Sequence, residues 1–291
     1  MHLNVIVRVK EDSSESAFKV ANEAVNGWKF SSQERMTHIA CYVFQHRLRQ
    51  SLAKHKLVAF ITNGAILPHK SGVSHAPMAS PPAVPFEAPK DSDLKRTIVI
   101  DMGTCQPYYA FLPSNGEITT SVSITGMAIA GGVTLIVGDR YHGKSILLRT
   151  IAAGVYNKIP SDGRELCVAV VDAVLMRAED GQYVNNCNAS AFISNLPTLP
   201  GFAKTLDTKN FPSREASGST SKKSNVAEAM DMGATAILVD DDVSAANFMA
   251  RYGRMRALVM DESITPLLYR VSGVHQTHGL SSIVVVRGVG D

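Results

Sequence analysis

The chain contains Gly138-Asp139-Arg140-Tyr141-His142-Gly143-Lys144-Ser145 directly after the apolar run 133–137. This is the complete pattern G-x-x-x-x-G-K-S of a phosphate-binding loop between a strand and a helix. Its glycines let backbone N–H groups approach a polyphosphate. Lys144 would neutralise the β and γ phosphates, Ser145 would offer its hydroxyl to Mg²⁺, and a helix predicted over 146–153 would add its positive end. The loop therefore predicts binding of a nucleoside triphosphate.

A second apolar run, 236–239, ends at Asp240. Such a run is typical of a buried parallel strand whose C-terminal end presents a carboxylate to the metal. Ser145 and Asp240 are therefore the predicted metal residues, and ATP with Mg²⁺ is the predicted ligand. The residues predicted to bind the nucleotide in the loop are Gly138, Asp139, Arg140, Tyr141, His142, Gly143, Lys144, Ser145 and Ile146.

Two short segments resemble motifs of the ABC class of ATPases. Asp240-Asp241-Asp242-Val243-Ser244-Ala245-Ala246-Asn247 is similar to the usual Asp-Glu-Pro-Thr-Ser-Ala-Leu-Asp, and Ala216-Ser217-Gly218-Ser219-Thr220 is similar to a degenerate Leu-Ser-Gly-Gly-Gln signature. A helix predicted over 225–232 places the signature at a helix N-terminus. In that class the signature grips the γ-phosphate held by the other protomer. The resemblance therefore implies a homodimer in which Ser217, Gly218, Ser219 and Thr220 complete the partner's site.

The likeness extends to the family of predicted ATPases of the ABC class, from near residue 50 to Asp291. It is carried by Gly132-Val133-Thr134-Leu135-Ile136-Val137-Gly138, Gly154-Val155-Tyr156-Asn157, Asp162-Gly163-Arg164-Glu165 and Arg177-Ala178-Glu179-Asp180-Gly181. That family is soluble, lacks transporter membrane domains and includes kinetoplastid members associated with mitochondrial RNA editing. The resemblance implies an α/β fold: a P-loop NTPase with an ABC-type ATPase core, whose mostly parallel sheet is flanked by helices, plus a smaller N-terminal α+β part.

The chain also departs from the family pattern. Asp241 stands where a glutamate usually orients the attacking water, and its shorter side chain predicts slow hydrolysis. Asp241 and Lys144 are the predicted catalytic residues. Arg287 follows the strand predicted over 282–286, so no switch histidine can be named. The residue of the Q-loop stays open between Glu179, Asp180 and Gln182.

Composition agrees with an intracellular soluble protein, cytoplasmic or mitochondrial. The 291 residues carry a net charge of +3, and no apolar run approaches the length of a membrane span. The four cysteines lack C-x-x-C spacing, which argues against a zinc site or a disulfide framework and predicts buried thiols. Because the resembled family is longer at both ends, the N-terminal part is expected to be truncated.

The predicted domains are a basic module over 1–67, a Pro-rich segment over 68–96 and the ATPase core over 97–291. The Pro-rich segment is either a mobile connector or an arm packed on the core. The basic module lacks acidic residues between Glu34 and Glu87. Apolar residues at helical spacing put four cations, Arg47, Arg49, Lys54 and Lys56, largely on a solvated face. Such a helix either tracks RNA phosphates or is only a charged surface.

These features predict a slow ATPase that acts as a nucleotide-driven dimer and controls RNA binding. Two alternatives stay open. A hydrolysis-deficient nucleotide-binding scaffold is consistent with Asp241 and the absent switch histidine. A small-molecule P-loop kinase would use Arg251, Arg254 and Arg256 as a phosphate-clamping lid.

Overall fold

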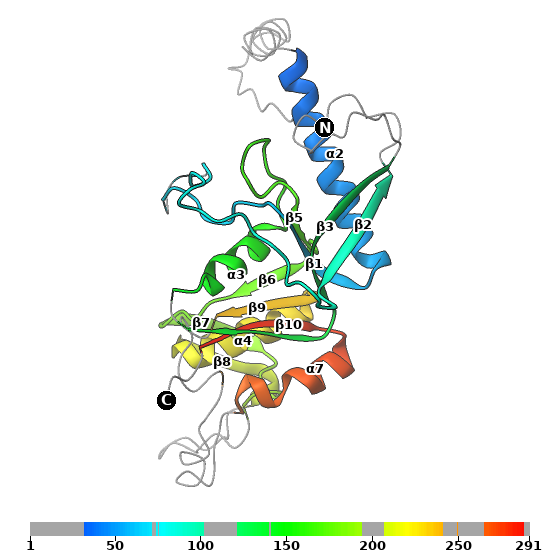
Figure 1. Cartoon of the computed structure of the whole chain (residues 1–291). Helices are drawn as coiled ribbons and strands as arrows, with labels where there is room; N and C mark the ends of the chain where they lie inside the picture. The colour runs from blue at the N-terminus through cyan, green and yellow to red at the C-terminus, as the bar shows by residue number, and fades with distance from the viewer. Residues whose placement is uncertain are drawn as a thin grey trace, which may run out of the picture.

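The computed structural model describes residues 32–71, 74, 76–101, 121–139, 141–193, 207–240, 249 and 265–287. Within these residues, helices and strands build two four-stranded sheets and one two-stranded sheet (Figure 1). One four-stranded sheet is parallel and carries the phosphate-binding loop. The other is antiparallel and carries the long N-terminal helix.

The parallel sheet has the order β4-β10-β9-β6, with β4 at Val133–Gly138, β10 at Ser281–Arg287, β9 at Ala236–Asp240 and β6 at Ala173–Met176. Each neighbouring pair is parallel, so the carboxyl ends of all four strands lie at one edge. The central strands β9 and β10 read as continuous apolar runs because both of their faces are buried.

Successive side chains of β9 and β10 enter two different cores. Leu238, Ile283 and Val285 join the core that includes Leu148 and Ile151 of α3 (Lys144–Ala153). Ile237, Val239 and Val284 join the core that includes residues of α4 (Gly218–Asp231) and α7 (Val271–His278). Accordingly, α3 covers one face of the sheet while α4 and α7 cover the other (Figure 1).

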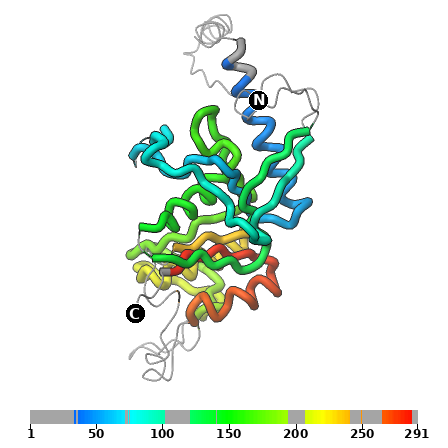
Figure 2. Tube along the Cα trace, viewed as in Figure 1, coloured from blue at the N-terminus to red at the C-terminus, as the bar shows by residue number. Residues whose placement is uncertain are grey.

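The antiparallel sheet has the order β2-β3-β1-β5, with β2 at Lys95–Asp101, β3 at Ser121–Ala130, β1 at Leu57–Thr62 and β5 at Cys167–Ala169. Helix α2 (Ser32–Lys54) packs on it through Phe44, Leu48 and Leu52, which share a core with Phe60 and Ile98. A Cβ on Gly126 would lie 2.2 Å from the Ile61 carbonyl oxygen, so only glycine allows β3 to pair there. The chain forms β1, β2 and β3 of this sheet before it reaches the phosphate loop and adds β5 after α3 (Figure 2).

Together these elements confirm the predicted α/β fold with a parallel sheet flanked by helices and a smaller α+β part. A two-stranded ribbon, β7 (Gln182–Cys187) with β8 (Phe211–Ala216), leads into α4, and short 3-10 turns lie at Thr208–Asn210 and Leu267–Tyr269. Among the described residues, no helix is both long enough and apolar enough to cross a membrane.

The Pro-rich segment returns to the strand that precedes it. The Gly64 amide donates to the Phe86 carbonyl at 2.7 Å, the Phe86 amide donates to the Ala65 carbonyl at 2.8 Å, and the Ala88 amide donates to the Asn63 side chain at 2.8 Å. β1, which lies before this segment, pairs with β3 and β5, which lie after it. The proposed domain boundaries at 67/68 and 96/97 stay a prediction.

Two sequence-based expectations about helices were wrong in detail. Helix α4 begins at Gly218 instead of near residue 225, because the polar residues 221–224 are buried against the core and form helix where they read as loop. Arg49 does not lie on a solvated face: it is half-buried and donates into the core. Lys54 and Lys56 are exposed, as expected.

Candidate nucleotide-binding site

The phosphate loop runs from the end of β4 to the start of α3. Gly143, the N-cap of α3, has φ 80, and an added Cβ would meet no heavy atom within 4 Å. Glycine is required there for backbone conformation and not for space. The Gly143 carbonyl accepts the Leu147 amide at 2.9 Å, which starts the helical hydrogen bonding of α3. The first amides of α3 therefore point toward the loop, where they suit an anion.

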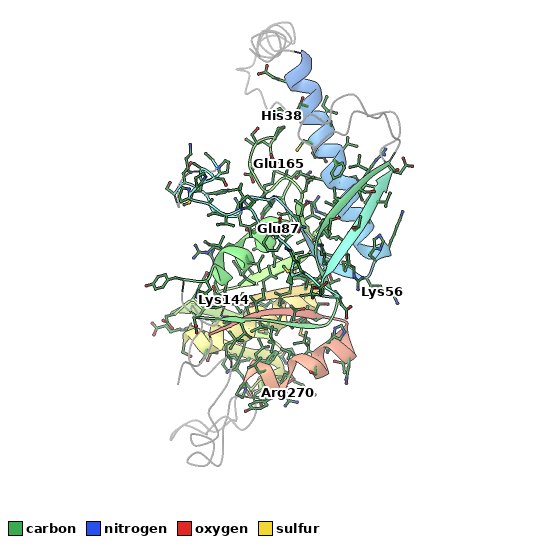
Figure 3. The ribbon with its side chains drawn as sticks, viewed as in Figure 1. His38, Lys56, Glu87, Lys144, Glu165 and Arg270 are labelled. Carbon is green, nitrogen blue, oxygen red and sulfur yellow. The ribbon has the colours of Figure 1, made fainter. Side chains whose placement is uncertain are left out.

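Lys144 lies folded along the loop. Its side chain is 8% exposed, and its ammonium group donates to the Asp139 carbonyl at 2.7 Å. A Cβ on Gly138 would lie 3.6 Å from Lys144 Cδ, so the lysine stem passes directly over that glycine. Lys144 is thus held at the N-terminal end of α3 (Figure 3), close to the loop backbone that would surround a polyphosphate.

Tyr141 is unusual for this loop. It has φ 65, a left-handed conformation that costs a residue with a Cβ about 1 kcal/mol or more. Its side chain is 101% exposed. A bulky residue with positive φ is uncommon and points to a constraint on the loop. His142 and Ile146 are also exposed, and Ser145 is partly exposed.

Asp240 ends β9 at the same edge of the sheet. Across β10, Asp240 is in register with Val285 and Val285 with Ile136, two residues before Gly138. One strand therefore separates the phosphate loop from Asp240, which corresponds to about 10 Å between β4 and β9. Asp240 is 7% exposed, and its carbonyl accepts from the Lys222 ammonium at 3.5 Å. The hydroxyl of Ser145 and the carboxylate of Asp240 are hard oxygen donors of the kind that Mg²⁺ prefers.

The signature segment lies at the N-terminus of α4, as predicted. Ser217 is the N-cap and is exposed, and its hydroxyl lies 3.0 Å from that of Thr220 and 3.3 Å from that of Ser219. Gly218 and Ser219 are buried. The accessible groups of this segment are therefore hydroxyls, with Ser217 the most exposed.

A loop that the sequence left unassigned binds the signature directly. Residues 177–181 follow β6 at the carboxyl edge of the parallel sheet. Asp180 Oδ1 accepts from the Gly218 amide at 2.5 Å, the Glu179 amide donates to Ser221 Oγ at 3.0 Å, and the Gly181 amide donates to the Ala216 carbonyl at 2.9 Å. The candidate Q-loop and the signature form one connected unit.

The three residues left open for the Q-loop have different surroundings. Asp180 is engaged with Gly218, and Gln182 Nε2 donates to Asn225 Oδ1 at 2.9 Å. The Glu179 side chain is exposed. The sequence indicates residues 177–181 as part of the family likeness and as Q-loop candidates, but it gives no sign of their contact with the signature, whose Gly218 lies 38 residues after Asp180.

Several predicted residues lie outside the described part of the chain. They are Arg140, the stretch from Asp241 to Asn247, and the three lid arginines Arg251, Arg254 and Arg256. The described residues bring together the loop, Lys144, Ser145 and Asp240 at one sheet edge, and Ser217 to Thr220 at a second helix terminus. The roles of all these residues stay predictions.

The chain matches a known protein family. The model of the ABC_ATPase family, described as a P-loop domain, matches residues 31–105 and 112–291. This match includes α2, both four-stranded sheets, the phosphate loop and the signature segment. No curated protein matches the chain.

Proposed function

Because the chain belongs to the ABC_ATPase family, whose P-loop domain covers most of it, we propose that it binds ATP with Mg²⁺ and hydrolyses the β–γ bond slowly. The observation that carries the proposal is the common edge of the parallel sheet, where Lys144 and Ser145 of α3 lie one strand away from Asp240. Lys144 would bind the phosphates, and Ser145 with Asp240 would hold Mg²⁺. The metal would supply charge neutralisation.

Binding and turnover of ATP test this proposal directly. Lys144→Ala is expected to reduce turnover by roughly 10²-fold or more, because a positioned cation that stabilises transition-state charge is lost. Arg149→Ala is the matched control, since Arg149 is an exposed cation on the same helix. Equal turnover in the two variants, or no ATP binding by the unaltered protein, would contradict the proposal.

The dimeric form of the mechanism is supported by the exposed Ser217 at the start of α4. In this proposal Ser217 to Thr220 of one chain face the γ-phosphate bound by the other chain, and Asp241 orients the attacking water. Ser217→Arg should block ATP-dependent dimerisation in analytical ultracentrifugation and also block turnover. Unchanged dimerisation together with unchanged turnover would exclude a role for the signature.

RNA is the proposed partner of the basic module. Lys54 ends α2, Lys56 lies in the turn between α2 and β1, and exposed Lys95 and Arg96 begin β2. Leu57, which follows Lys56, pairs with Ala130, while Lys95 pairs with Met127, so both pairs of cations lie near one end of β3. Such a group suits phosphates.

The RNA proposal predicts a binding constant that falls with salt. Replacing Lys54 and Lys56 by Gln should reduce the slope of the logarithm of the binding constant against the logarithm of the salt concentration by about two. Arg149→Gln in α3 should leave this slope unchanged. RNA binding that is absent, or that ignores salt, would remove RNA from the proposed function.

A scaffold that binds ATP without hydrolysis is the second candidate function. It is favoured by Asp241, the shorter acid at the position where the family usually has glutamate. ATP binding with no turnover by the assembled dimer would establish this alternative.

A further inference from the structure

Arg49 of α2 reaches the C-terminal end of the phosphate-loop helix. Its guanidinium donates to three acceptors: the carbonyl of Gly154, which caps α3, at 3.0 Å, the carbonyl of Ala169 at 3.2 Å, and Asn157 Oδ1 at 2.9 Å. Burial lowers the pKa of Arg49 from its ordinary value, yet guanidinium stays charged in proteins. A rigid fork with five donors can hold three acceptors in one geometry, which an ammonium group cannot.

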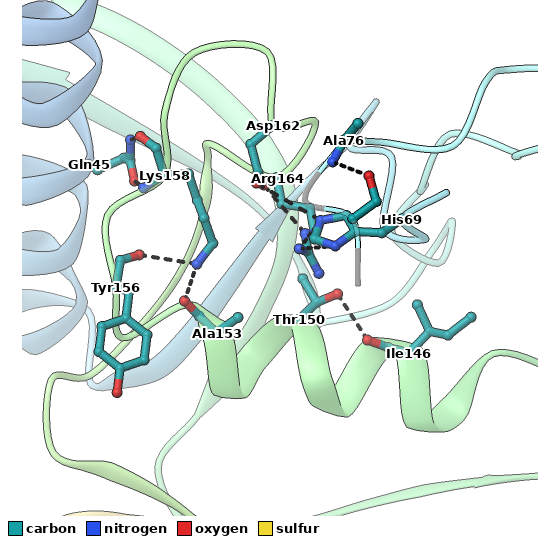
Figure 4. A network of polar contacts seen from close by, with 11 residues as sticks. Gln45, His69, Ala76, Ile146, Thr150, Ala153, Tyr156, Lys158, Asp162 and Arg164 are labelled. Atoms are coloured by element: carbon teal, nitrogen blue, oxygen red, sulfur yellow. Dashed lines mark hydrogen bonds and ion pairs between the residues drawn. The ribbon is translucent and has the colours of Figure 1, made fainter. Parts of the chain in front are cut away.

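Gln45, one turn earlier on α2, makes a second link to the same region. Its side chain is fully buried, and it pairs with the backbone of Lys158 in both directions (Figure 4). Gln45 Nε2 donates to the Lys158 carbonyl at 2.8 Å, and the Lys158 amide donates to Gln45 Oε1 at 2.6 Å. The side chain amide thus fixes the chain that leaves α3.

Lys158 closes the network at the helix end. Its ammonium donates to the Ala153 carbonyl, in the last residue of α3, and burial lowers its pKa. Arg49 and Lys158 therefore place two cations at the negative end of the α3 dipole. A Cβ on Gly154 would lie 2.8 Å from the Ala169 amide nitrogen, so glycine allows this end of α3 to lie directly against β5.

Among the described residues, polar contacts join α2 to the C-terminal end of α3. Phe44, Leu48 and Leu52 of α2 belong to the core under the antiparallel sheet. Leu148 and Ile151 of α3 belong to a different core, between α3 and the two sheets. Because hydrogen bonds depend on direction more strongly than apolar contacts do, the link fixes the position of α3 along its axis.

We propose that Arg49 and Gln45 are positioning residues for the nucleotide site. They hold the C-terminal end of α3, whose opposite end carries Lys144 and Ser145 about 15 Å away, and a helix transmits a displacement over that length. The same contacts carry a nucleotide-dependent shift of α3 to α2. This inference rests on the proposed function, because it requires that α3 binds ATP.

Hydrogen exchange and steady-state kinetics of the full chain test the inference together. In the unaltered protein, ATP·Mg²⁺ should slow exchange in residues 138–148 and also in the α2 residues 45–54, the latter by about fivefold, the lower end of typical coupling between sites. Arg49→Gln should keep the first effect, lose the second and lower kcat about tenfold with a smaller change in KM, because misplaced groups slow chemistry.

Arg49→Lys separates positioning from mere charge. It keeps a cation at the end of α3 but not the three-acceptor fork, so it should fold and still lack the α2 response. Arg47→Gln is the matched control: Arg47, two residues away, donates to the Asp101 carbonyl at 2.6 Å and does not reach α3 in any contact of the described residues. Arg47→Gln should retain the response.

The outcomes distinguish the inference from the function on which it rests. If ATP·Mg²⁺ slows exchange in the loop but never in α2, or if Arg49→Lys and Arg49→Gln both behave as the unaltered protein, the inference is wrong and ATP binding stands. If exchange in the loop itself is unaffected by ATP·Mg²⁺, the proposed function fails and the inference fails with it. Exchange does not require hydrolysis, so the test also holds for a scaffold.

Discussion

The carboxylate of Asp180 lies 2.5 Å from the amide nitrogen of Gly218 and accepts its hydrogen bond. Asp180 thereby satisfies one of the free amides at the start of α4 in place of the N-cap residue Ser217, whose side chain makes no capping bond. The glycine of the signature gives this carboxylate room. A Cβ at position 218 would stand 2.9 Å from Asp180 Oδ1 and 3.4 Å from Ala178 Cβ.

We expect Gly218→Ala to destabilise the protein by about 0.5–2 kcal/mol, the range for a lost helix cap, because the added methyl displaces Asp180. Urea denaturation would measure the loss. Gly273→Ala is the control: Gly273 lies within α7, where an added Cβ meets nothing within 4 Å, so alanine should stabilise slightly. A Gly218→Ala variant as stable as the Gly273→Ala variant would show that Asp180 does not cap α4 through Gly218.

Asp180→Ala should cost a similar free energy of unfolding, and the double variant should cost little more than either single one. Residues that share one contact give non-additive changes, so the double-mutant cycle reports the coupling between positions 180 and 218. Fully additive losses would show that the two residues act separately.

The buried thiols predict a loss of stability at alkaline pH. Burial raises the pKa of Cys41 and of Cys167 to about 12. An unfolded thiol ionises near about pH 8.5, so above that pH the unfolded state releases protons that the folded state retains, and the free energy of unfolding falls by up to about 1.4 kcal/mol per pH unit for each thiol.

Urea denaturation at about pH 8 and about pH 10 would measure this slope. The contribution is fully present below the unfolded pKa and disappears as pH rises through the folded pKa. The double variant Cys41→Ala, Cys167→Ala should show a shallower dependence of the free energy of unfolding on pH. Comparing the two proteins removes the contribution of lysines and tyrosines, which titrate in both. Equal slopes would mean that the two thiols ionise alike in both states.

Asp241→Glu should accelerate ATP turnover several-fold if the shorter acid limits orientation of the water, since general-base steps typically contribute about 10²–10⁴-fold and depend on reach. Single-turnover kinetics with bound ATP would isolate the chemical step. Asp242→Glu, the same change one residue later, is the control and should have no effect. No gain from Asp241→Glu, with ATP still bound, favours the scaffold.

The Pro-rich segment should be released when its polar anchor is removed. Arg164 Nε lies 3.4 Å from Asp162 Oδ1, and the same guanidinium contacts the ring of His69 (Figure 4). Asp162 is buried, so its carboxylate depends on these partners. Arg164→Met should increase the rate of tryptic cleavage after the exposed Lys70.

Arg96→Met serves as the control for that digestion, because the Arg96 side chain is exposed and, among the described residues, donates only to the nearby Asp93 carbonyl. If both variants are cut at the same rate as the unaltered chain, the cluster of His69, Asp162 and Arg164 does not hold the segment.

The sequence predicted the parts of this fold that local pattern controls. The apolar run before Asp240 is a strand because both faces of β9 are buried. The run before Gly138 forms the edge strand β4, although Val133, Leu135 and Val137 are exposed, and the loop glycines mark the turn between β4 and α3. Arg49 shows why other parts escaped. The sequence predicted a largely solvated face for it, but its burial depends on the end of α3 and on β5, which lie far along the chain.

The same reason applies to the start of α4. Ser221 and Ser224 are weak signals for helix, and residues 221–224 become helical because tertiary contacts bury them. Asp180 is a candidate for the Q-loop, but its contact with Gly218 could not be predicted locally, since Gly218 lies beyond the ribbon of β7 and β8. Side chains that join distant segments could not be assigned from spacing alone.

The position of β10 has a consequence for biosynthesis. This strand follows β4, β6 and β9 in the chain and yet lies between β4 and β9 in the sheet. Until residue 287 leaves the ribosome, β4 and β9 have no common neighbour, and each exposes an unpaired backbone edge that is prone to wrong association. A nascent chain stalled before β10 should therefore fail to retain ATP and should bind chaperones, and late pairing of this kind predicts slow folding.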